Sequence, residues 1–304
     1  MNALVLSGGS VKGAFQAGAL PVVFSKGYVP EYIWGVSIGA LNGAFLVDRA
    51  GRAASTGLTP NWHHIGDDLK TFWQTNVTKP DDLVTKRIFP LVPSLWGSFN
   101  GLLDTTKLQT LVRRTLDEKY LVQSPCGYAA GVVDLIEGSY FNADLTTAKL
   151  LDHIIASTSI PVTMPLVKQG TTWLADGGVR DIAPLRHAID ADASRIVVIA
   201  CQAKKLEAKT FNPGNPVALL ERVIEILTDE ILQNDLTTLE WINLHCPKSG
   251  TPVASGPFKG KRYIPTTVIR PEKNLVIDIT KFTSADISQL IKEGEAAAKK
   301  ASLP

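Results

Sequence analysis

The chain has 304 residues, of which 45% are hydrophobic and 20% are charged. This composition is ordinary for a globular protein with a large core, and it contains no low-complexity tail. The formal net charge of +2 is close to balance, so it gives no reason to expect nucleic acid as a partner.

The cysteines and the N-terminal residues bear on metal sites and on location. Cys126, Cys201 and Cys246 form no CxxC motif, which disfavours a zinc site and predicts buried free thiols in a reducing compartment. The start MNALVLSGGS lacks the basic region and the long apolar run of a signal peptide. No uncharged stretch has the length of a membrane span. We expect no metal, no cofactor, and a protein that is cytoplasmic or peripheral at a membrane.

The first part of the chain alternates strand and helix patterns. Residues 3–6 form an apolar run that residues 7–9, Ser-Gly-Gly, bring to an end. Residues 13–26 have helical spacing, residues 31–36 predict a second strand, and residues 38–47 predict a helix of small and apolar residues. This order is typical of an α/β sheet.

The pattern weakens over residues 51–103, which hold three of the six tryptophans and repeated prolines and glycines. This stretch predicts an insertion or cap rather than a strand of the central sheet. Beyond it the expected elements are a helix to about Leu116, strands at 126–135, 139–142 and 195–201, a helix at 150–157, a hairpin at 166–174, a long helix from Asn215 and a last helix from Thr283.

A serine lies between two glycines in the run Gly35-Val36-Ser37-Ile38-Gly39, after a predicted strand and before a predicted helix. This is the G-x-S-x-G pattern of a nucleophile elbow, in which a sharp turn lifts the serine oxygen clear of the sheet. Side chains at the two glycines would collide with neighbouring backbone. The following helix would direct its amides and dipole at developing negative charge. The alternative is a glycine-bracketed turn without chemistry.

A second glycine-rich turn follows the first strand and contains Gly8, Gly9, Ser10, Lys12 and Gly13. Backbone amides in such a turn can bind an anion. The spacing matches neither the Rossmann fingerprint nor the Walker loop, so a nucleotide-phosphate site is disfavoured. Because the two turns follow successive strands, their ends would lie side by side, and an oxyanion hole fits better than a plain turn.

A third motif, Asp176-Gly177-Gly178, follows a predicted strand and places a carboxylate at the edge of the sheet. On its own this pattern most often marks a turn. Together, the three motifs resemble the patatin-like phospholipase family, which has a glycine-rich oxyanion loop, G-x-S-x-G shortly after it and D-G-[AG] well downstream. The likeness continues over residues 156–161, 179–184, 264–274 and 282–294 and is least over residues 51–103.

The resemblance implies a three-layer α/β/α fold around a central, mostly parallel sheet, in a single acyl hydrolase domain over 1–304 with the insertion or cap at 51–103. It implies a lipid or ester substrate, with Ser37 as nucleophile, Asp176 as base and the glycine-rich turn as oxyanion hole. Lys12 matches a Lys or Arg of the family's loop. Ser10 departs from the family, because a third consecutive glycine is usual there and a Cβ atom restricts the backbone angles.

A serine hydroxyl needs a base to take its proton, and two arrangements compete. In the dyad that the resemblance implies, Asp176 contacts Ser37 directly. In a triad of the α/β-hydrolase order, His187 or His245 would lie between them, although neither has motif context. We favour the dyad. A different class, a non-catalytic anion-binding module in which Ser37 is inert, is disfavoured by the missing nucleotide-binding spacings.

Residues 88–103, IFPLVPSLWGSFNGLL, are the candidate interfacial or lid segment. Phe89, Trp96 and Phe99 suit a bilayer interface, and the preceding Lys86 and Arg87 could meet anionic headgroups. The alternative is that these aromatic residues pack into the core. If the aromatic residues lie on the surface instead, the segment predicts transient contact with a membrane surface. The sequence leaves the oligomeric state, the head group and the chain length open.

Overall fold

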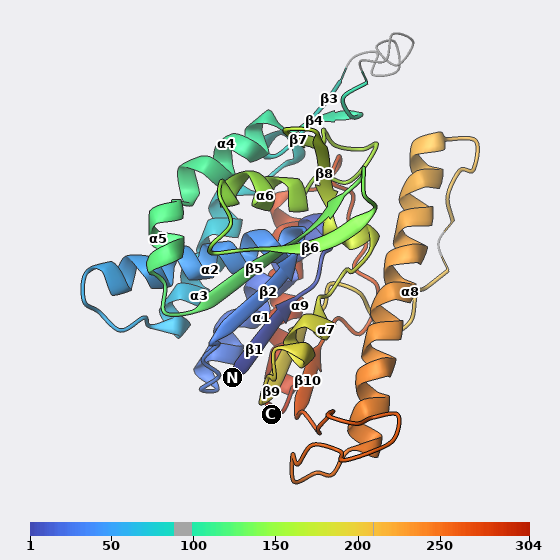
Figure 1. The fold of residues 1–304 in the computed structure, drawn as a ribbon. Helices are drawn as coiled ribbons and strands as arrows, with labels where there is room; N and C mark the ends of the chain where they lie inside the picture. Colours follow the sequence, from blue (N-terminus) through green and yellow to red (C-terminus); the bar gives the residue numbers. More distant parts are fainter. Residues whose placement is uncertain (88–98, 209) are drawn as a thin grey trace.

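The computed structural model describes residues 1–87, 99–208 and 210–304. Within these residues, eight strands form one central sheet with helices on both faces (Figure 1). The strand order is β10 (Thr266–Ile269), β9 (Arg195–Ile199), β1 (Asn2–Leu6), β2 (Tyr32–Val36), β5 (Gly127–Asp134), β8 (Thr172–Asp176) and β7 (Val167–Gln169), with β6 (Ser139–Asp144) also paired to β5. The short strands β3 (Thr85–Lys86) and β4 (Leu103–Asp104) form a separate pair.

The sheet is mostly parallel. Strands β10, β9, β1, β2 and β5 pair in parallel, whereas β6, β7 and β8 pair antiparallel. One face is covered by α1 (Gly13–Ser25), α2 (Ile38–Ser55), α3 (Trp62–Asn76), α4 (Thr106–Thr115), α5 (Glu118–Gln123), α6 (Leu150–Ser157) and α9 (Ser284–Lys300). The other face is covered by α7 (Leu185–Asp190) and α8 (Pro216–His245). The predicted α/β/α architecture is confirmed.

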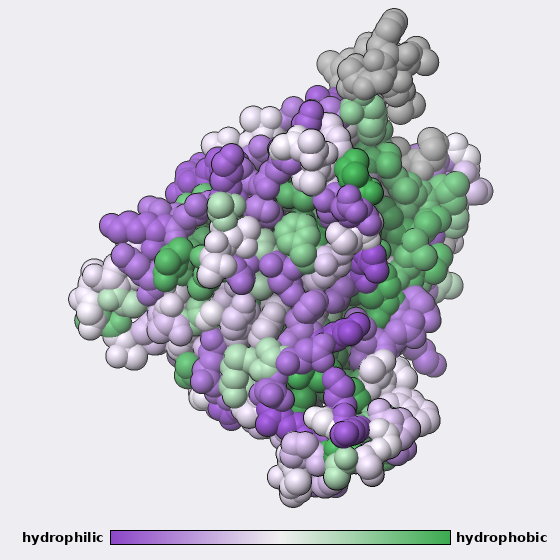
Figure 2. All heavy atoms as spheres, in the orientation of Figure 1, coloured by the Kyte–Doolittle hydropathy of each residue, from purple (hydrophilic) through white to green (hydrophobic). Residues whose placement is uncertain are grey.

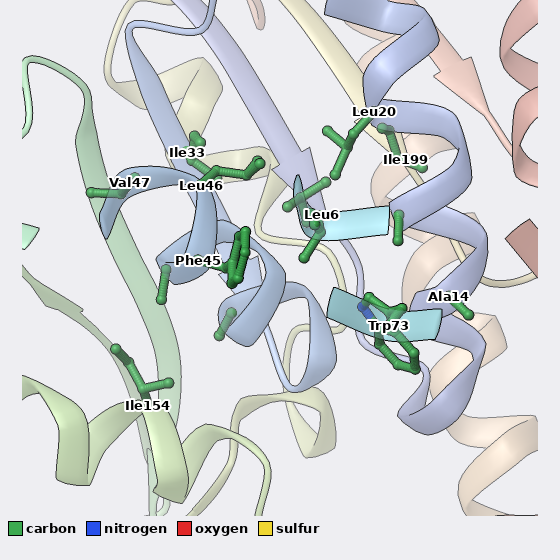
Figure 3. Close-up of a cluster of buried hydrophobic side chains, with 14 of the residues drawn as sticks. Leu6, Ala14, Leu20, Ile33, Phe45, Leu46, Val47, Trp73, Ile154 and Ile199 are labelled. Atoms are coloured by element: carbon green, nitrogen blue, oxygen red, sulfur yellow. The ribbon is translucent and has the colours of Figure 1, made fainter. Parts of the chain in front are cut away.

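Alternation along the strands divides the core into two clusters. Leu4 and Leu6 of β1 pack under the larger helical layer, whereas Ala3 and Val5 face α7 and α8. Successive side chains of a strand point to opposite faces, so a strand covered on both faces must be apolar throughout. Figure 3 shows Leu6 among apolar residues from the neighbouring strands and from α1 and α2.

Helix α1 is the central member of the larger layer, since α3 and α9 pack against it. Eleven of its 13 residues are buried, so its sequence is apolar on all sides. A Cβ atom at Gly18 would lie 1.9 Å from the Ile291 carbonyl oxygen, and one at Gly294 would lie 1.9 Å from the Phe15 carbonyl oxygen. The two glycines therefore permit the close crossing of α1 and α9.

The segment 51–103 contributes to this core through α3, whose Trp62, Ile65, Leu69 and Trp73 are buried in the same cluster as α1. Most of the candidate interfacial segment 88–103, including Phe89 and Trp96, lies outside the described residues. Phe99 is described and is partly exposed.

Two general expectations can be compared with the described residues. No helix among them is both long enough and apolar enough to cross a membrane. Cys126, Cys201 and Cys246 are all buried and free of disulfide bonds, as the sequence predicts.

Candidate active site

The register of β5 brings two distant motifs together. Strand β6 pairs with β5 over residues 129–134, and those residues include partners of both β2 and β8. Because a strand has only two edges, β2 and β8 must share the edge opposite β6. Strand β2 ends with Val36 opposite Gly131, and β8 ends with Asp176 opposite Val132. The two strands run toward each other and end at adjacent positions, which places Ser37 beside Asp176.

Ser37 occupies a strained turn between β2 and α2. Its φ of 55° and ψ of −125° lie in a region that residues with side chains rarely adopt, at a cost of about 1–3 kcal/mol. A Cβ atom at Gly35 would lie 2.4 Å from the Gly39 carbonyl oxygen, and one at Gly39 would lie 2.2 Å from the Leu6 carbonyl oxygen. Glycine is therefore required on both sides of the turn by close backbone contacts.

Asp176 is 4% exposed, and this burial raises the pKa of its carboxyl group to about 7. The Ser37 hydroxyl and the Gly178 N–H favour the ionised form and oppose the rise, the latter through a hydrogen bond of 2.7 Å to Oδ1. A Cβ atom at Gly178 would lie 3.0 Å from that Oδ1 atom, so glycine lets the backbone approach the carboxylate. A carboxylate of this pKa can accept a proton at neutral pH.

The end of α6 supports both groups, and sequence reasoning assigned it no role. The Ser37 N–H donates to Ser157 Oγ at 2.9 Å, and the Ser157 hydroxyl donates to the Gly131 carbonyl at 2.7 Å. The Asp176 N–H donates to the Ser159 carbonyl at 3.0 Å. The likeness over residues 156–161 was the available signal, but spacing alone does not reveal these contacts.

The glycine-rich turn lies against the elbow. A Cβ atom at Gly8 would lie 3.1 Å from the Ser37 Cβ, and the Gly8 N–H donates to the Ile182 carbonyl at 2.9 Å. That amide is therefore occupied, whereas the N–H groups of Gly9 and Ser10 have no hydrogen-bond acceptor among the described residues. Ser10 has a φ of 54°, in the region that favours glycine.

The last two residues of the turn lead into α1. Lys12 ends the short 3-10 helix Ser10–Lys12 and forms no ion pair within the part of the chain that the structure describes. A Cβ atom at Gly13 would lie 2.2 Å from Ile38 Cγ1, so this glycine allows the starts of α1 and α2 to pack together. Gly177 has a similar role at the third motif, where a Cβ atom would lie 2.5 Å from the Gly131 carbonyl oxygen.

The two histidines that a triad could use have other partners. His187 stacks on Tyr140, with ring centroids 5.4 Å apart. His245 lies at the end of α8, stacked on the rings of Trp241 and Phe258. Within the described residues, no hydrogen bond joins a histidine to Ser37 or Asp176.

The comparison with family models decides the classification. The model described as "Patatin-like phospholipase" matches residues 4–189, more than half of the chain. The chain belongs to the patatin-like phospholipase family. This membership supports lipid acyl hydrolase activity in general terms.

The other comparisons add little to the family match. The crystal structure of VipD from Legionella pneumophila is similar, with a TM-score of 0.46 and 13% identity, over 98% of this chain and 66% of that one. A comparison with curated proteins found no match.

A pocket lies beside Ser37. It has a volume of about 750 Å³, counting the space open to solvent, and Ser37 and Ser10 line it. Its wall is otherwise largely apolar and comes mainly from α2, α3 and α4, including Leu41, Phe45 and Leu111. No group of three or more His, Cys, Asp or Glu side chains among the described residues could hold a metal ion.

Proposed function

We propose that this chain is a serine lipid acyl hydrolase of the phospholipase A, lysophospholipase or esterase type, acting through a Ser37–Asp176 dyad and an acyl-enzyme. The observation that carries the proposal is the placement of the two groups side by side at the ends of β2 and β8. Ser37, in a strained strand-to-helix turn, lies beside a buried carboxylate whose pKa is raised to about 7, and its hydroxyl favours the ionised form of that carboxylate.

The chemistry follows from this placement. Ser37 Oγ attacks the ester carbonyl carbon while Asp176 takes the hydroxyl proton, and the carbonyl oxygen becomes an oxyanion. The free N–H groups of Gly9 and Ser10 would stabilise that charge, at roughly 3–4 kcal/mol for a well-placed donor. The alcohol leaves with the proton from Asp176. A water molecule then loses a proton to Asp176 and attacks the acyl-enzyme, which releases the fatty acid and restores Ser37.

The largely apolar pocket supports a fatty-acyl substrate. Its apolar lining can pack against a hydrocarbon group that extends away from Ser37 between α2, α3 and α4. Because α3 comes from the segment 51–103 and is buried in the same core as α1, we also infer that this segment belongs to a single acyl hydrolase domain.

We propose transient contact with a membrane surface as the route by which lipid reaches Ser37. The first half of α8 carries exposed apolar residues, namely Leu219, Val223, Ile226 and Leu227. Figure 2 shows hydrophobic residues over this half of α8, which rises at the same end of the molecule as the carboxyl end of β1 (Figure 1). Flotation of the protein with phospholipid vesicles measures this contact.

Labelling with a fluorophosphonate probe tests the proposed function. We expect covalent labelling of the wild type, no labelling of Ser37→Ala, and undiminished labelling of Ser249→Ala, a control at an exposed serine. Hydrolysis of a chromogenic short-chain ester and release of fatty acid from mixed phospholipids and glycerides should follow the same order. Equal labelling of Ser37→Ala and wild type would reject Ser37 as the nucleophile, and an unlabelled, inactive wild type would favour the anion-binding alternative.

A further inference from the structure

Ser10 has a hydroxyl group that the protein itself leaves unused. Its Oγ atom is buried, and among the described residues it is the one buried side-chain nitrogen or oxygen atom without a hydrogen-bond partner. Buried hydroxyl groups in folded proteins almost always have a partner, because losing water without replacement is unfavourable. An orphaned hydroxyl in a native structure therefore needs an explanation, and a ligand that supplies the missing partner is one.

The backbone at this position makes the hydroxyl more notable. Ser10 has a φ of 54°, where glycine would adopt the same angles without a steric penalty. Serine thus adds two unfavourable features at this position, a strained backbone and an unsatisfied polar atom. Neither feature has a compensating contact within the described residues.

Ser10 lies in the wall of the pocket that contains the nucleophile. Ser10 and Ser37 line the same pocket, and Gly8 of the same turn lies against the Ser37 side chain. The other polar side chains of the pocket near the elbow are satisfied internally. Asn42 bonds with Gln16, the Gly13 carbonyl and Trp73, and the Thr158 hydroxyl donates to the Ile155 carbonyl. Among the described residues, the Ser10 hydroxyl is the one in this part of the pocket wall that is left without a partner.

We propose that Ser10 is a further catalytic residue, whose hydroxyl donates a hydrogen bond to the carbonyl oxygen of the scissile ester. This inference rests on the proposed function. Besides the backbone N–H groups of Gly9 and Ser10, the oxyanion would then receive a third donor from a side chain. Because the negative charge on this oxygen grows in the transition state, the hydrogen bond strengthens there and accelerates the acylation and deacylation steps alike.

Two substitutions at this position separate the hydroxyl from the backbone strain. Ser10→Gly removes the hydroxyl and relieves the strain, whereas Ser10→Ala removes the hydroxyl and keeps the strain. We expect both variants to lose about 10²-fold in kcat, the loss found for a single oxyanion donor, with KM changed little. We expect Ser10→Gly to melt at or above the wild-type temperature, so its lost activity cannot come from unfolding. Ser249→Ala serves as the control for a serine outside the pocket.

Two further measurements identify the atom that Ser10 contacts. An alkyl trifluoromethyl ketone adds to the active serine and places a negatively charged oxygen in the oxyanion hole. We expect Ser10→Gly to weaken its inhibition by a factor similar to the loss in kcat. The fold loss should also be the same for a nitrophenyl ester and for a phospholipid with the same acyl chain, since the carbonyl is common to both.

The opposite results overturn the proposal. Wild-type rates in Ser10→Gly would show that the hydroxyl is not used, and a loss confined to the phospholipid would show contact with the head group instead. Fluorophosphonate labelling of the wild type distinguishes these failures from failure of the proposed function. If Ser37 is labelled and Ser10→Gly is fully active, the dyad stands and only the role of Ser10 is lost.

Discussion

Two strand-to-helix turns lie side by side in this protein, and each holds a serine at nearly the same positive φ. Ser37 follows β2 with a φ of 55°, and Ser10 follows β1 with a φ of 54°. The partners of the two residues differ. The Ser37 N–H donates to Ser157 and its side chain lies beside Asp176, whereas the Ser10 N–H and hydroxyl have no partner among the described residues.

The difference shows how a serine at a similar φ can act as a nucleophile in one turn and as a hydrogen-bond donor in the other. At Ser37 the protein supplies every partner, including a base that can withdraw the hydroxyl proton, and the oxygen can become a nucleophile. At Ser10 the protein supplies no base and no acceptor, so the N–H and O–H groups are left to donate to a ligand. Strain in both turns fits the general association of unusual backbone angles with functional sites.

The largest expected effect comes from removing the base. Asp176→Asn leaves Ser37 beside a neutral amide that cannot accept its proton. Ser37 would then lack a base, as Ser10 does. We expect kcat for a chromogenic ester to fall about 10⁴-fold, as in other enzymes whose catalytic aspartate is neutralised. His187→Ala and His245→Ala should retain most activity, because both histidines stack on aromatic rings and neither is hydrogen-bonded to Ser37 or Asp176 within the described residues. Activity that survives Asp176→Asn and is lost in a histidine variant would instead support the triad.

The second effect is a pH dependence that Ser10 cannot produce. Asp176 must be ionised to act as a base, and burial raises its pKa to about 7. We expect kcat/KM to fall about tenfold for each pH unit below that value and to level off above it. A profile that shows no inflection near neutral pH would contradict this assignment.

The same titration should act on stability with the opposite sign. The pKa of Asp176 is higher in the folded protein than its ordinary value of 3.8, so the folded state binds the proton more tightly. Its contribution to stability is therefore complete at low pH and is lost as the pH rises toward about 7. The free energy of unfolding in urea should therefore fall for the wild type relative to Asp176→Asn, and the difference between the two proteins should change by roughly 3 kcal/mol from pH 5 to pH 8. Asp181 and Asp235 also have raised pKa values, of about 7 and about 6. Their contributions are common to both proteins and cancel when the variant is compared with the wild type.

The sequence was sufficient for the local parts of this site and insufficient for its long-range contacts. Glycines at 35 and 39 predicted the elbow because they bracket Ser37 within five residues, although the backbone that a Cβ atom at Gly39 would meet belongs to Leu6 of the neighbouring strand. The meeting of Ser37 with Asp176 depends on β2 and β8 sharing one edge of β5, and pairings between segments about 95 and about 44 residues apart leave no local pattern. The support from Ser157 was missed for the same reason. The occupied Gly8 amide depends on Ile182, which is equally remote in sequence.

The smallest effect concerns the N–H group that distinguishes the two turns. Ser157→Ala removes the acceptor of the Ser37 N–H and leaves that buried donor unpaired, like the N–H of Ser10. We expect the free energy of unfolding to fall by about 1–3 kcal/mol, the usual cost of an unsatisfied buried group. We expect kcat to fall about tenfold, because Ser157 positions Ser37 without touching substrate, while KM changes little. Ser159→Ala is the matched control, since the Ser159 hydroxyl donates only to the Ile155 carbonyl. If both variants lose kcat equally, the effect belongs to the packing of α6 and not to the turn at Ser37.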